Sequence, residues 1–313
     1  MAAYGRGLED YLLFCETQGI CAEEATREHI ALYVHDMANR PTQTARTASK
    51  ERQQAGLANA TMQQRLTVVR LFYDHLIDEQ MRDHNPVGRG HYTTGKGFGG
   101  ARERRLVPRY RKLPWIPAEA EWLAVLDVVR KESLRTRLMF AMSYDAGLRR
   151  EELCLLETGD IDPAHQRLRI RAETTKNRQE RILPYCGATS LLYGAYLQQR
   201  RELSRERGPL FLSESRRNRA QPLSIWTWSK VVHDIAQRAD VPRFTPHTLR
   251  HLCLTDLARS GWDIHEIAQF AGHRSLQSTL LYIHLSGREL ADRLQRSLNT
   301  MRSARTDMLE GLL

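Results

Sequence analysis

The sequence contains few cysteines and no long hydrophobic run. Its five cysteines are scattered along 313 residues without a C-x-x-C pair, so they indicate neither a disulfide framework nor a zinc knuckle. No stretch approaches the ~20 apolar residues of a membrane span. The opening residues, MAAYGRGLEDYLLF, also lack the apolar core of a signal peptide. We therefore expect a soluble protein of the reducing cytoplasm, without a membrane partner.

The sequence also has fewer acidic residues than basic ones. The chain carries 47 Lys and Arg against 37 Asp and Glu, a formal net charge of +10. Most of these cations are arginines, whose planar guanidinium binds phosphate in a bidentate manner. The excess favours a polyanionic partner, with nucleic acid as the first candidate. A basic protein without such a partner is the alternative that charge alone leaves open.

Residues 1–87 are predicted to form a small helical domain. Apolar residues recur at helical spacing over residues 4–18 and 24–38, and a longer pattern begins near Asn59. Residues 88–113 differ, because they are rich in glycine and basic side chains. We interpret them as an interdomain linker that is extended when alone and could lie along a phosphate backbone. A solvated linker without a partner is the alternative. The basic residues concerned are Arg89, Lys96, Arg102, Arg104, Arg105, Arg109, Arg111 and Lys112.

Residues 114–313 are predicted to form a second, longer domain that is mainly helical. Residues 168–184 are the exception, because apolar positions at Leu168, Ile170 and Ile182 flank the polar turn 174–178. This pattern is typical of a β-hairpin. The fold class expected for the whole chain is therefore mainly α with a small β-sheet.

Four signals predict where helices begin and end in the second domain. Thr245-Pro246 is an N-cap followed by proline, and Asp263 to Glu266 form a capping box. Gly261 and Gly272 are predicted to end the helices that precede them. A further short helix is expected around Tyr282, with Leu276, Leu280 and Leu281 packed inward and the tyrosine pointing elsewhere.

Several polar residues near these helix ends could handle a phosphate. His247 and Arg250 share one face at a helix start, where backbone N–H groups and the helix dipole favour an anion. His273 follows the turn at Gly272. An H-x-x-R match alone is weak evidence, because about one is expected by chance among twelve histidines in an arginine-rich chain. The structural alternative is an imidazole that is simply hydrogen-bonded at the start of a helix.

An arginine pair stands at another break between helices. In Ala146-Gly-Leu-Arg149-Arg150-Glu-Glu152-Leu, the glycine interrupts one helix and a second helix begins. The Gly-Leu-Arg frame favours Arg149 over Arg150 as the phosphate-facing residue. A surface ion pair with the adjacent glutamates is the alternative.

Taken together and in order, these motifs resemble the tyrosine recombinases of the phage-integrase type. The motifs are Ala-Gly-Leu-Arg149-x-x-Glu-Leu, Thr-Lys176-x-x-x-Glu-Arg, His247-x-x-Arg250-His251, Gly272-His273 and Tyr282-x-His284. The N-terminal region is similar to the family's core-binding domain, which ends here in Asn85-Pro86. The resemblance implies a helical, SAM-like core-binding domain and a mixed α/β catalytic domain.

The resemblance also implies a chemical role for the residues at the matched positions. Tyr282 is the expected nucleophile, which attacks a scissile DNA phosphate to give a 3′-phosphotyrosyl link and a free 5′-hydroxyl. A phenol has a pKa of about 10 and must lose its proton during attack. His247 occupies the position of the family's candidate base, and His251 is expected to support its neighbours rather than act in catalysis.

The remaining matched residues are expected to handle the phosphate. Arg149 and Arg250 would clamp the non-bridging oxygens. Lys176, on the hairpin turn, would protonate the departing 5′ oxygen, and His273 would donate a hydrogen bond. The resemblance implies no cofactor, because the phosphotyrosyl bond conserves the energy of the broken phosphodiester and two guanidinium groups replace a divalent ion.

The implied function is site-specific recombination or integration by DNA strand transfer, in an enzyme that needs neither metal nor ATP. The expected partner is double-stranded DNA with a short core site and inverted repeats, and the expected setting is a mobile element and the nucleoid. Self-association as a dimer or tetramer is expected, with a tail from about residue 286 docking on a neighbouring copy. Packing of this tail onto its own domain is the alternative.

Two other functions fit part of the pattern. A catalytically inactive DNA-binding regulator could share the fold, although it would have no need of a tyrosine beside a phosphate clamp. A zinc-dependent hydrolase could use His247 and His251, four residues apart on a helix, with Cys253 nearby. Against zinc, no glutamate follows the first histidine, and Arg250 would place a cation beside the metal.

Overall fold

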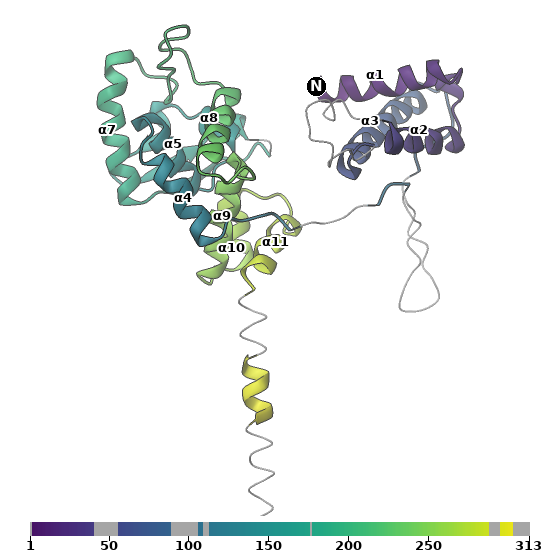
Figure 1. The fold of residues 1–313 in the computed structure, drawn as a ribbon. Coiled ribbons are helices and arrows are strands. Elements are labelled where there is room, and N and C mark those ends of the chain that lie inside the picture. The colour runs from purple at the N-terminus through teal and green to yellow at the C-terminus, as the bar shows by residue number, and fades with distance from the viewer. Residues whose placement is uncertain are drawn as a thin grey trace, which may run out of the picture. The chain divides into compact units, whose positions relative to one another are not determined.

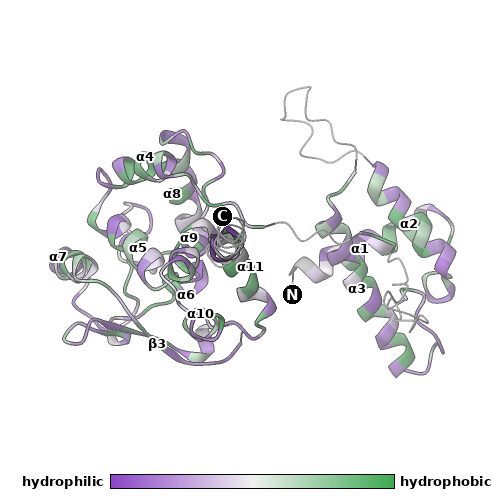
Figure 2. Cartoon of the chain, turned by 90° about the horizontal axis from the view of Figure 1, so that it is seen from below, coloured by the Kyte–Doolittle hydropathy of each residue, from purple (hydrophilic) through white to green (hydrophobic). Residues whose placement is uncertain are grey.

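The computed structural model describes residues 2–40, 56–88, 106–108, 113–175, 177–287 and 295–302. The chain divides into two compact units, residues 1–112 and 113–313 (Figure 1). In Figure 2, hydrophobic and hydrophilic residues alternate along the helices of both units, as expected where one face of each helix is buried. No helix in the described part of the chain is both long and apolar enough to cross a membrane.

The first unit contains the three predicted helices, α1 (Ala2–Thr17), α2 (Arg27–Asn39) and α3 (Asn59–Asp78). Tyr11, Tyr33 and Tyr73, one from each helix, meet in its core and are fully buried. A buried phenol needs a hydrogen-bond partner. Tyr73 donates to the backbone oxygen of Ala22 at 2.7 Å, and Tyr33 donates to Asp10 at 2.6 Å. The Tyr33 bond joins α2 to α1, the Tyr73 bond joins α3 to the segment between α1 and α2, and the hydroxyls of Tyr11 and Tyr73 join α1 to α3.

Part of the predicted linker belongs to the first unit. Val107 is buried in the same core as the three tyrosines, and Gln63 on α3 donates to the backbone oxygen of Pro108 at 3.0 Å. At this point the segment interpreted as an extended linker packs against the helices of the first unit. The reason is local, because Leu106-Val107-Pro108 is an apolar triplet within an otherwise basic segment. The eight basic residues named above for this linker lie outside the described residues.

The second unit is mainly helical with one small sheet, as predicted. Its α-helices are α4 (Glu119–Val129), α5 (Leu134–Asp145), α6 (Arg150–Cys154), α7 (Gly187–Leu203), α8 (Ile225–Arg238), α9 (Pro246–Arg259), α10 (Ile264–Ala271) and α11 (Gln277–Ser286). Its strands are β1 (Ile161–Asp162), β2 (Arg167–Ile170) and β3 (Arg181–Pro184). Short 3-10 helices cover Thr158–Asp160 and Ala172–Thr174.

An aromatic stack fixes the helices around α9. Trp122 on α4, Phe140 on α5 and Phe244 before α9 have ring centroids 5.7–6.3 Å apart and nearly parallel planes. Phe244 is 1% exposed. Offset stacking of this kind adds to the stabilisation from burial alone. It holds the start of α9, and therefore His247 and Arg250, against α4 and α5.

The predicted hairpin is present, and its register decides which apolar residues are buried. Strands β2 and β3 pair antiparallel, with Leu168 opposite Leu183 and Arg169 opposite Ile182, and β1 adds a third strand. Leu183 is buried, whereas Ile182 is 62% exposed. Ile182 is exposed because the register places it on the same face as Arg169. A shift of one residue moves a strand side chain to the opposite face.

The four predicted helix boundaries are confirmed. Thr245 precedes α9, and its backbone N–H donates to the hydroxyl of Thr248 at 3.0 Å. Asp263 caps α10 by accepting from the N–H of Glu266 at 2.9 Å, and the Glu266 carboxylate accepts in return. Helix α9 ends before Gly261, and α10 ends at Gly272, whose φ of 60° favours glycine.

We predict that Phe244→Ala lowers the free energy of unfolding of the second unit by about 3–5 kcal/mol, because it leaves a cavity in a stacked, fully buried core. Urea unfolding followed by tryptophan fluorescence measures this unit, since all five tryptophans lie beyond residue 113. As a control, Leu191→Ala on α7 removes a side chain that is 78% exposed. It should change stability by less than about 0.5 kcal/mol. Equal effects of the two substitutions would contradict the assigned role of the stack.

Candidate active site

The break between α5 and α6 places Arg149 at the N-cap of α6. Gly147 within this break has φ of 54°. A Cβ atom at Gly147 would lie 3.3 Å from the ring of Phe270 and 3.4 Å from Cys253 Sγ, so both conformation and space favour glycine. The Arg149 guanidinium donates to Glu152 Oε1 at 2.6 Å and to the backbone oxygen of Gly272 at 3.1 Å. Arg149 therefore connects the start of α6 with the end of α10.

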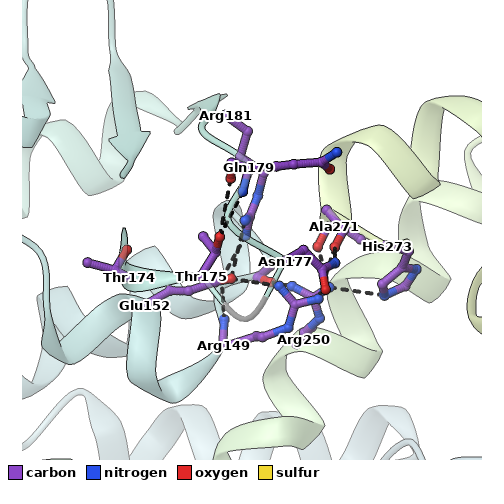
Figure 3. A network of polar contacts seen from close by, with 12 residues as sticks. Arg149, Glu152, Thr174, Thr175, Asn177, Gln179, Arg181, Arg250, Ala271 and His273 are labelled. Atoms are coloured by element: carbon purple, nitrogen blue, oxygen red, sulfur yellow. Dashed lines mark hydrogen bonds and ion pairs between the residues drawn. The ribbon is translucent and has the colours of Figure 1, made fainter. Parts of the chain in front are cut away.

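Glu152 is the buried carboxylate of the site. It is 1% exposed and pairs with both Arg149 and Arg181, the latter at 2.6 Å from Arg181 Nη2 to Glu152 Oε2 (Figure 3). Burial alone would raise the pKa of Glu152. Hydrogen bonding and charge from Arg181, and then from Arg149, outweigh burial and hold that pKa below its ordinary value. Glu152 thus remains ionised and holds the two guanidinium groups in place.

Arg250 on α9 lies beside Arg149 and is 4% exposed (Figure 3). Its guanidinium donates to the backbone oxygens of Gly147 and Ala271, each at 2.5 Å. Burial, followed by the charge of Arg149, lowers the pKa of Arg250 to about 10, so the group remains charged at neutral pH. The carbonyl of Ala271 is at the C-terminal end of α10, where the helix dipole favours a cation.

The three guanidinium groups of Arg149, Arg181 and Arg250 face one carboxylate, that of Glu152. Three positive charges against one negative charge leave an excess of two. Arg149 and Arg181 also line a cleft of about 730 Å³ together with Gly272, His273 and two carboxylates, Glu180 and Glu266, so the excess charge belongs to the arginine cluster behind the cleft wall. Partly desolvated guanidinium groups in excess make this part of the second unit suited to an anion such as phosphate.

Hydrogen bonds determine the tautomer of His273. Arg250 Nη2 lies 3.0 Å from His273 Nε2, and a guanidinium can only donate, so Nε2 is the acceptor. Burial, followed by the charge of Arg250, lowers the pKa of His273 to about 3, so the ring is neutral at pH 7. The ring proton is therefore on Nδ1, which donates to the hydroxyl of Thr279 at 2.9 Å. Thr279 is fully buried on α11.

Tyr282 on α11 is 4% exposed and lies between two imidazole rings. The ring of His273 stacks at 6.0 Å between centroids, and the ring of His251 lies at 5.8 Å. The Tyr282 hydroxyl is 2.9 Å from His251 Nδ1. Burial raises the pKa of Tyr282, while the charges of Arg250 and Arg149 act to lower it. The phenol is consequently protonated at rest, beside cations that would stabilise a phenolate.

The expected orientation of α11 was wrong. We predicted that Leu276 packs inward and Tyr282 points away, whereas Leu276 is 40% exposed and Tyr282 and Thr279 are buried. Tyr282 and Thr279 are three residues apart and share one face of the helix. Hydrogen bonds with His251 and His273 satisfy their hydroxyls, so this polar face can be buried. Leucine content alone could not identify it.

The two histidines of α9 differ in their surroundings. His247 is exposed, and its pKa is lowered by partial desolvation and by the charges of Arg150, Arg250 and Arg149, against an opposing effect of Glu151. His251 is less exposed. Among the described residues, it is His251 and not His247 that hydrogen-bonds the Tyr282 hydroxyl.

The hairpin turn reaches the same site. Asn177 donates to the backbone oxygen of Gly272 at 3.0 Å, the carbonyl that Arg149 also contacts. Thr175 is buried and accepts from the N–H of Gln179 at 3.1 Å. Lys176, the expected general acid, lies between them but outside the described residues. Its immediate neighbours thus border the cleft.

The structure brings together Arg149, Arg250, His251, His273 and Tyr282. Arg150, the alternative to Arg149, pairs with Glu151 at 2.7 Å and lies over the ring of Trp226.

Glu152, Arg181 and Thr279 were not predicted as site residues. Glu152 is the glutamate of the Arg149-x-x-Glu-Leu motif, and Arg181 is the arginine of the Lys176-x-x-x-Glu-Arg motif. Their pairing across α6 and β3 is visible only in the fold.

The residues considered for zinc do not form a metal site in the described part of the chain. No group of three or more histidine, cysteine, aspartate or glutamate side chains there is arranged to hold a metal ion. His251 contacts the phenol of Tyr282, and Cys253 is buried against the backbone oxygen of Asp145.

We predict that Glu152→Gln lowers the free energy of unfolding of the second unit by about 3–5 kcal/mol at neutral pH, because two partly buried arginines lose the counter-charge of a buried carboxylate. A carboxyl whose folded pKa is lowered stabilises the protein above its unfolded pKa, and this stabilisation disappears as the pH falls through the folded value. The difference between wild type and variant should therefore shrink below the ordinary pKa of 4.5.

Urea unfolding by tryptophan fluorescence at a series of pH values measures this difference. The exposed Glu180 lies on the same hairpin, and Glu180→Gln is the matched control, expected to behave as wild type. A difference between wild type and Glu152→Gln that does not change with pH would contradict the assigned ion pairs.

We predict that Thr279→Val releases the Nδ1–H of His273 and destabilises the second unit by about 1 kcal/mol, because a buried donor loses its acceptor. Nitrogen-15 NMR of labelled histidines should report a protonated Nδ1 in wild type and a change of this signal in the variant. Thr279→Ser retains the hydroxyl and should retain the wild-type signal. A protonated Nε2 in the wild-type protein would contradict the assigned tautomer.

Comparison with known proteins supplies the family. The model of the phage integrase family matches residues 118–289, more than half of the chain. Tyrosine recombinase XerC of Pelotomaculum thermopropionicum is 29% identical over 246 residues, covering 76% of this chain and 74% of that protein. Tyrosine recombinase XerA of Pyrococcus furiosus is 30% identical over 207 residues, covering 66% and 70%.

A solved structure agrees in fold. The Tn1549 transposon integrase, in complex with transposon right end DNA, matches with a TM-score of 0.64 and 16% identity, covering 93% of both chains. At this sequence identity the likeness shows a shared fold. Membership of the family follows from the match of the family model to residues 118–289. The chain belongs to the phage integrase family, the tyrosine recombinases that cleave and rejoin DNA strands.

Proposed function

We propose that Tyr282 of this recombinase attacks a scissile DNA phosphate and forms a 3′-phosphotyrosyl intermediate with a free 5′-hydroxyl. The observation that carries the proposal is the position of Tyr282 beside a cluster with two positive charges in excess. Arg250 and Arg149 both act to lower the pKa of the Tyr282 phenol. The same charges would stabilise the negative charge that develops on the phosphate oxygens during attack.

The two arginines have different parts in this proposal. Arg149 is 23% exposed and borders the cleft, so it can approach a non-bridging oxygen while Glu152 holds it. Arg250 is bonded to two carbonyls and to His273 in the absence of DNA. A phosphate would exchange with one or more of these uncharged acceptors, because a guanidinium bound to an anionic oxygen gains Coulomb attraction that a neutral carbonyl or imidazole does not supply.

The two remaining roles involve proton donors. His273 can donate to the phosphate from Nε2 only after it leaves Arg250 and changes tautomer, and the Thr279 hydroxyl can donate to Nδ1 in that second tautomer. Lys176 on the hairpin turn is the proposed general acid for the 5′ oxygen. Religation by a 5′-hydroxyl from another strand gives recombination.

We place this activity in a mobile element, as an integrase or transposase that acts in the nucleoid on a short core site with inverted repeats. The Tn1549 integrase bound to transposon DNA supports this setting by its fold.

We also propose that the enzyme assembles as a dimer or tetramer on DNA. Residues 295–302 are helical, and Leu298 and Met301 are 38% and 55% exposed there. An exposed apolar pair of this kind supports docking on a second copy, although most of the tail lies outside the described residues.

An inactive DNA-binding regulator of the same fold is the competing function. The buried Tyr282 beside the arginine cluster favours the enzyme, since two guanidinium groups in excess and a phenol are costly to bury without a purpose.

We predict that wild-type protein forms a covalent adduct with a DNA substrate that carries a nick near the cleavage position, and that Tyr282→Phe forms none while binding DNA with unchanged affinity. Denaturing gel electrophoresis detects the adduct, and a filter or mobility-shift assay measures binding. Arg149→Lys and Arg250→Lys should each slow adduct formation about 10²–10³-fold.

Tyr193→Phe is the matched control, because it removes a phenolic hydroxyl from α7, outside the site. It should leave adduct formation unchanged. An adduct that persists in Tyr282→Phe would refute the nucleophile, and an adduct lost on adding a metal chelator would favour the zinc alternative.

A further inference from the structure

Among the described residues, the hydrogen-bond partner of the Tyr282 hydroxyl is His251, which the sequence motifs leave in a supporting role. His251 Nδ1 is 2.9 Å from the Tyr282 hydroxyl, and the two ring centroids are 5.8 Å apart. A general base must be within hydrogen-bond reach of the proton that it removes. His251 meets this condition in the described site, whereas His247 is on the preceding turn of α9 and is exposed.

The direction of the hydrogen bond follows from the protonation states. Burial raises the pKa of Tyr282, so the phenol keeps its proton at neutral pH. Burial, followed by the charges of His247 and Arg250, lowers the pKa of His251 to about 4, so the imidazole is neutral. A buried, protonated phenol must donate its hydrogen bond. Tyr282 therefore donates to Nδ1, and the ring proton of His251 is on Nε2.

We propose that His251 is the general base that accepts the proton of Tyr282 during DNA cleavage and returns it during rejoining. The inference rests on the proposed function of Tyr282 as the nucleophile. A bond forms between Tyr282 Oη and phosphorus, and the bond between phosphorus and the 5′ oxygen breaks. The phenolic proton passes to His251 Nδ1, and the 5′ oxygen takes a proton from the general acid, for which Lys176 is the candidate.

The charges around His251 change when DNA binds. In the free protein the neighbours that face it are His247 and Arg250 on α9, Tyr282 on α11 and His273 after α10, and the cations among them disfavour a second positive charge. A phosphate beside Arg250 brings negative charge, which favours protonated His251. The base is therefore weak at rest and becomes stronger when the substrate is in place.

This assignment leaves His247 free for another role. Its exposed ring is at the first turn of α9, close to the start of the helix. There it can donate a hydrogen bond to a phosphate oxygen without reaching the phenol.

The substitutions His251→Asn and His251→Ala distinguish two possible roles of His251. One role is to hold the Tyr282 hydroxyl in position by a hydrogen bond, and the other is to accept its proton. Asn at position 251 can still accept a hydrogen bond from Tyr282 through its side-chain oxygen, but it cannot take the proton. His251→Asn and His251→Ala should both slow adduct formation on the nicked substrate by about 10²–10⁴-fold, the usual contribution of a general base. If His251 only holds the phenol in place, His251→Asn should retain nearly full activity.

Two further measurements address the proton itself. Imidazole added to His251→Ala should restore adduct formation in proportion to the concentration of its neutral form. The wild-type rate should fall as the pH drops through the pKa of His251 in the complex, and His251→Asn should lose this dependence. A substrate with sulfur in place of the bridging 5′ oxygen, whose thiolate leaves without a proton, should not restore His251→Asn.

The control is His233→Asn, which replaces an exposed histidine on α8 and should behave as wild type. DNA binding and tryptophan fluorescence show whether each variant is folded. Full activity of His251→Asn with the wild-type pH dependence, while Tyr282→Phe is inactive, would overturn the proposal and leave Tyr282 as the nucleophile. A wild-type protein that forms no adduct would instead overturn the proposed function on which the inference rests.

Discussion

The site depends on one buried carboxylate, that of Glu152. It joins α6 to β3 by holding Arg149 and Arg181, and through Arg149 it reaches the end of α10 at Gly272. Buried cations are costly unless they are paired, so the position of Glu152 determines where guanidinium groups can stand. A single carboxylate for three arginines leaves positive charge uncompensated. This imbalance makes the arginine cluster suited to an anion.

Beside this cluster, two sets of hydrogen bonds meet on one face of α11. Arg250 donates to His273 and His273 donates to Thr279, while Tyr282, one helical turn after Thr279, donates to His251. The protonation state of each ring follows from these neighbours. Introduction of a phosphate at Arg250 would alter the first of these bonds. The tautomer of His273 and the basicity of His251 would respond, which links substrate binding to activation of the phenol.

The sequence predicted features that depend on neighbouring residues. The caps at Thr245 and Asp263, the stops at Gly261 and Gly272 and the antiparallel hairpin are confirmed, because each follows from local hydrogen bonding or backbone conformation. Predictions of which side faces inward were less successful. The leucine face of α11 was misassigned, since hydrophobicity alone does not give the hydrogen bonds that let Tyr282 and Thr279 be buried.

The sequence by itself determined the fold class, the family and, apart from His251, the residues on which a catalytic role is proposed, because these are carried by motifs whose members lie within a few positions of each other. Only the tertiary structure decided which of two histidines on one helix touches the tyrosine, and which glutamate holds the arginines. Those contacts join α6, β3, α9 and α11, which are far apart along the chain. The geometry of these contacts depends on how the helices and strands pack, and the spacing of residues along the sequence does not specify that packing.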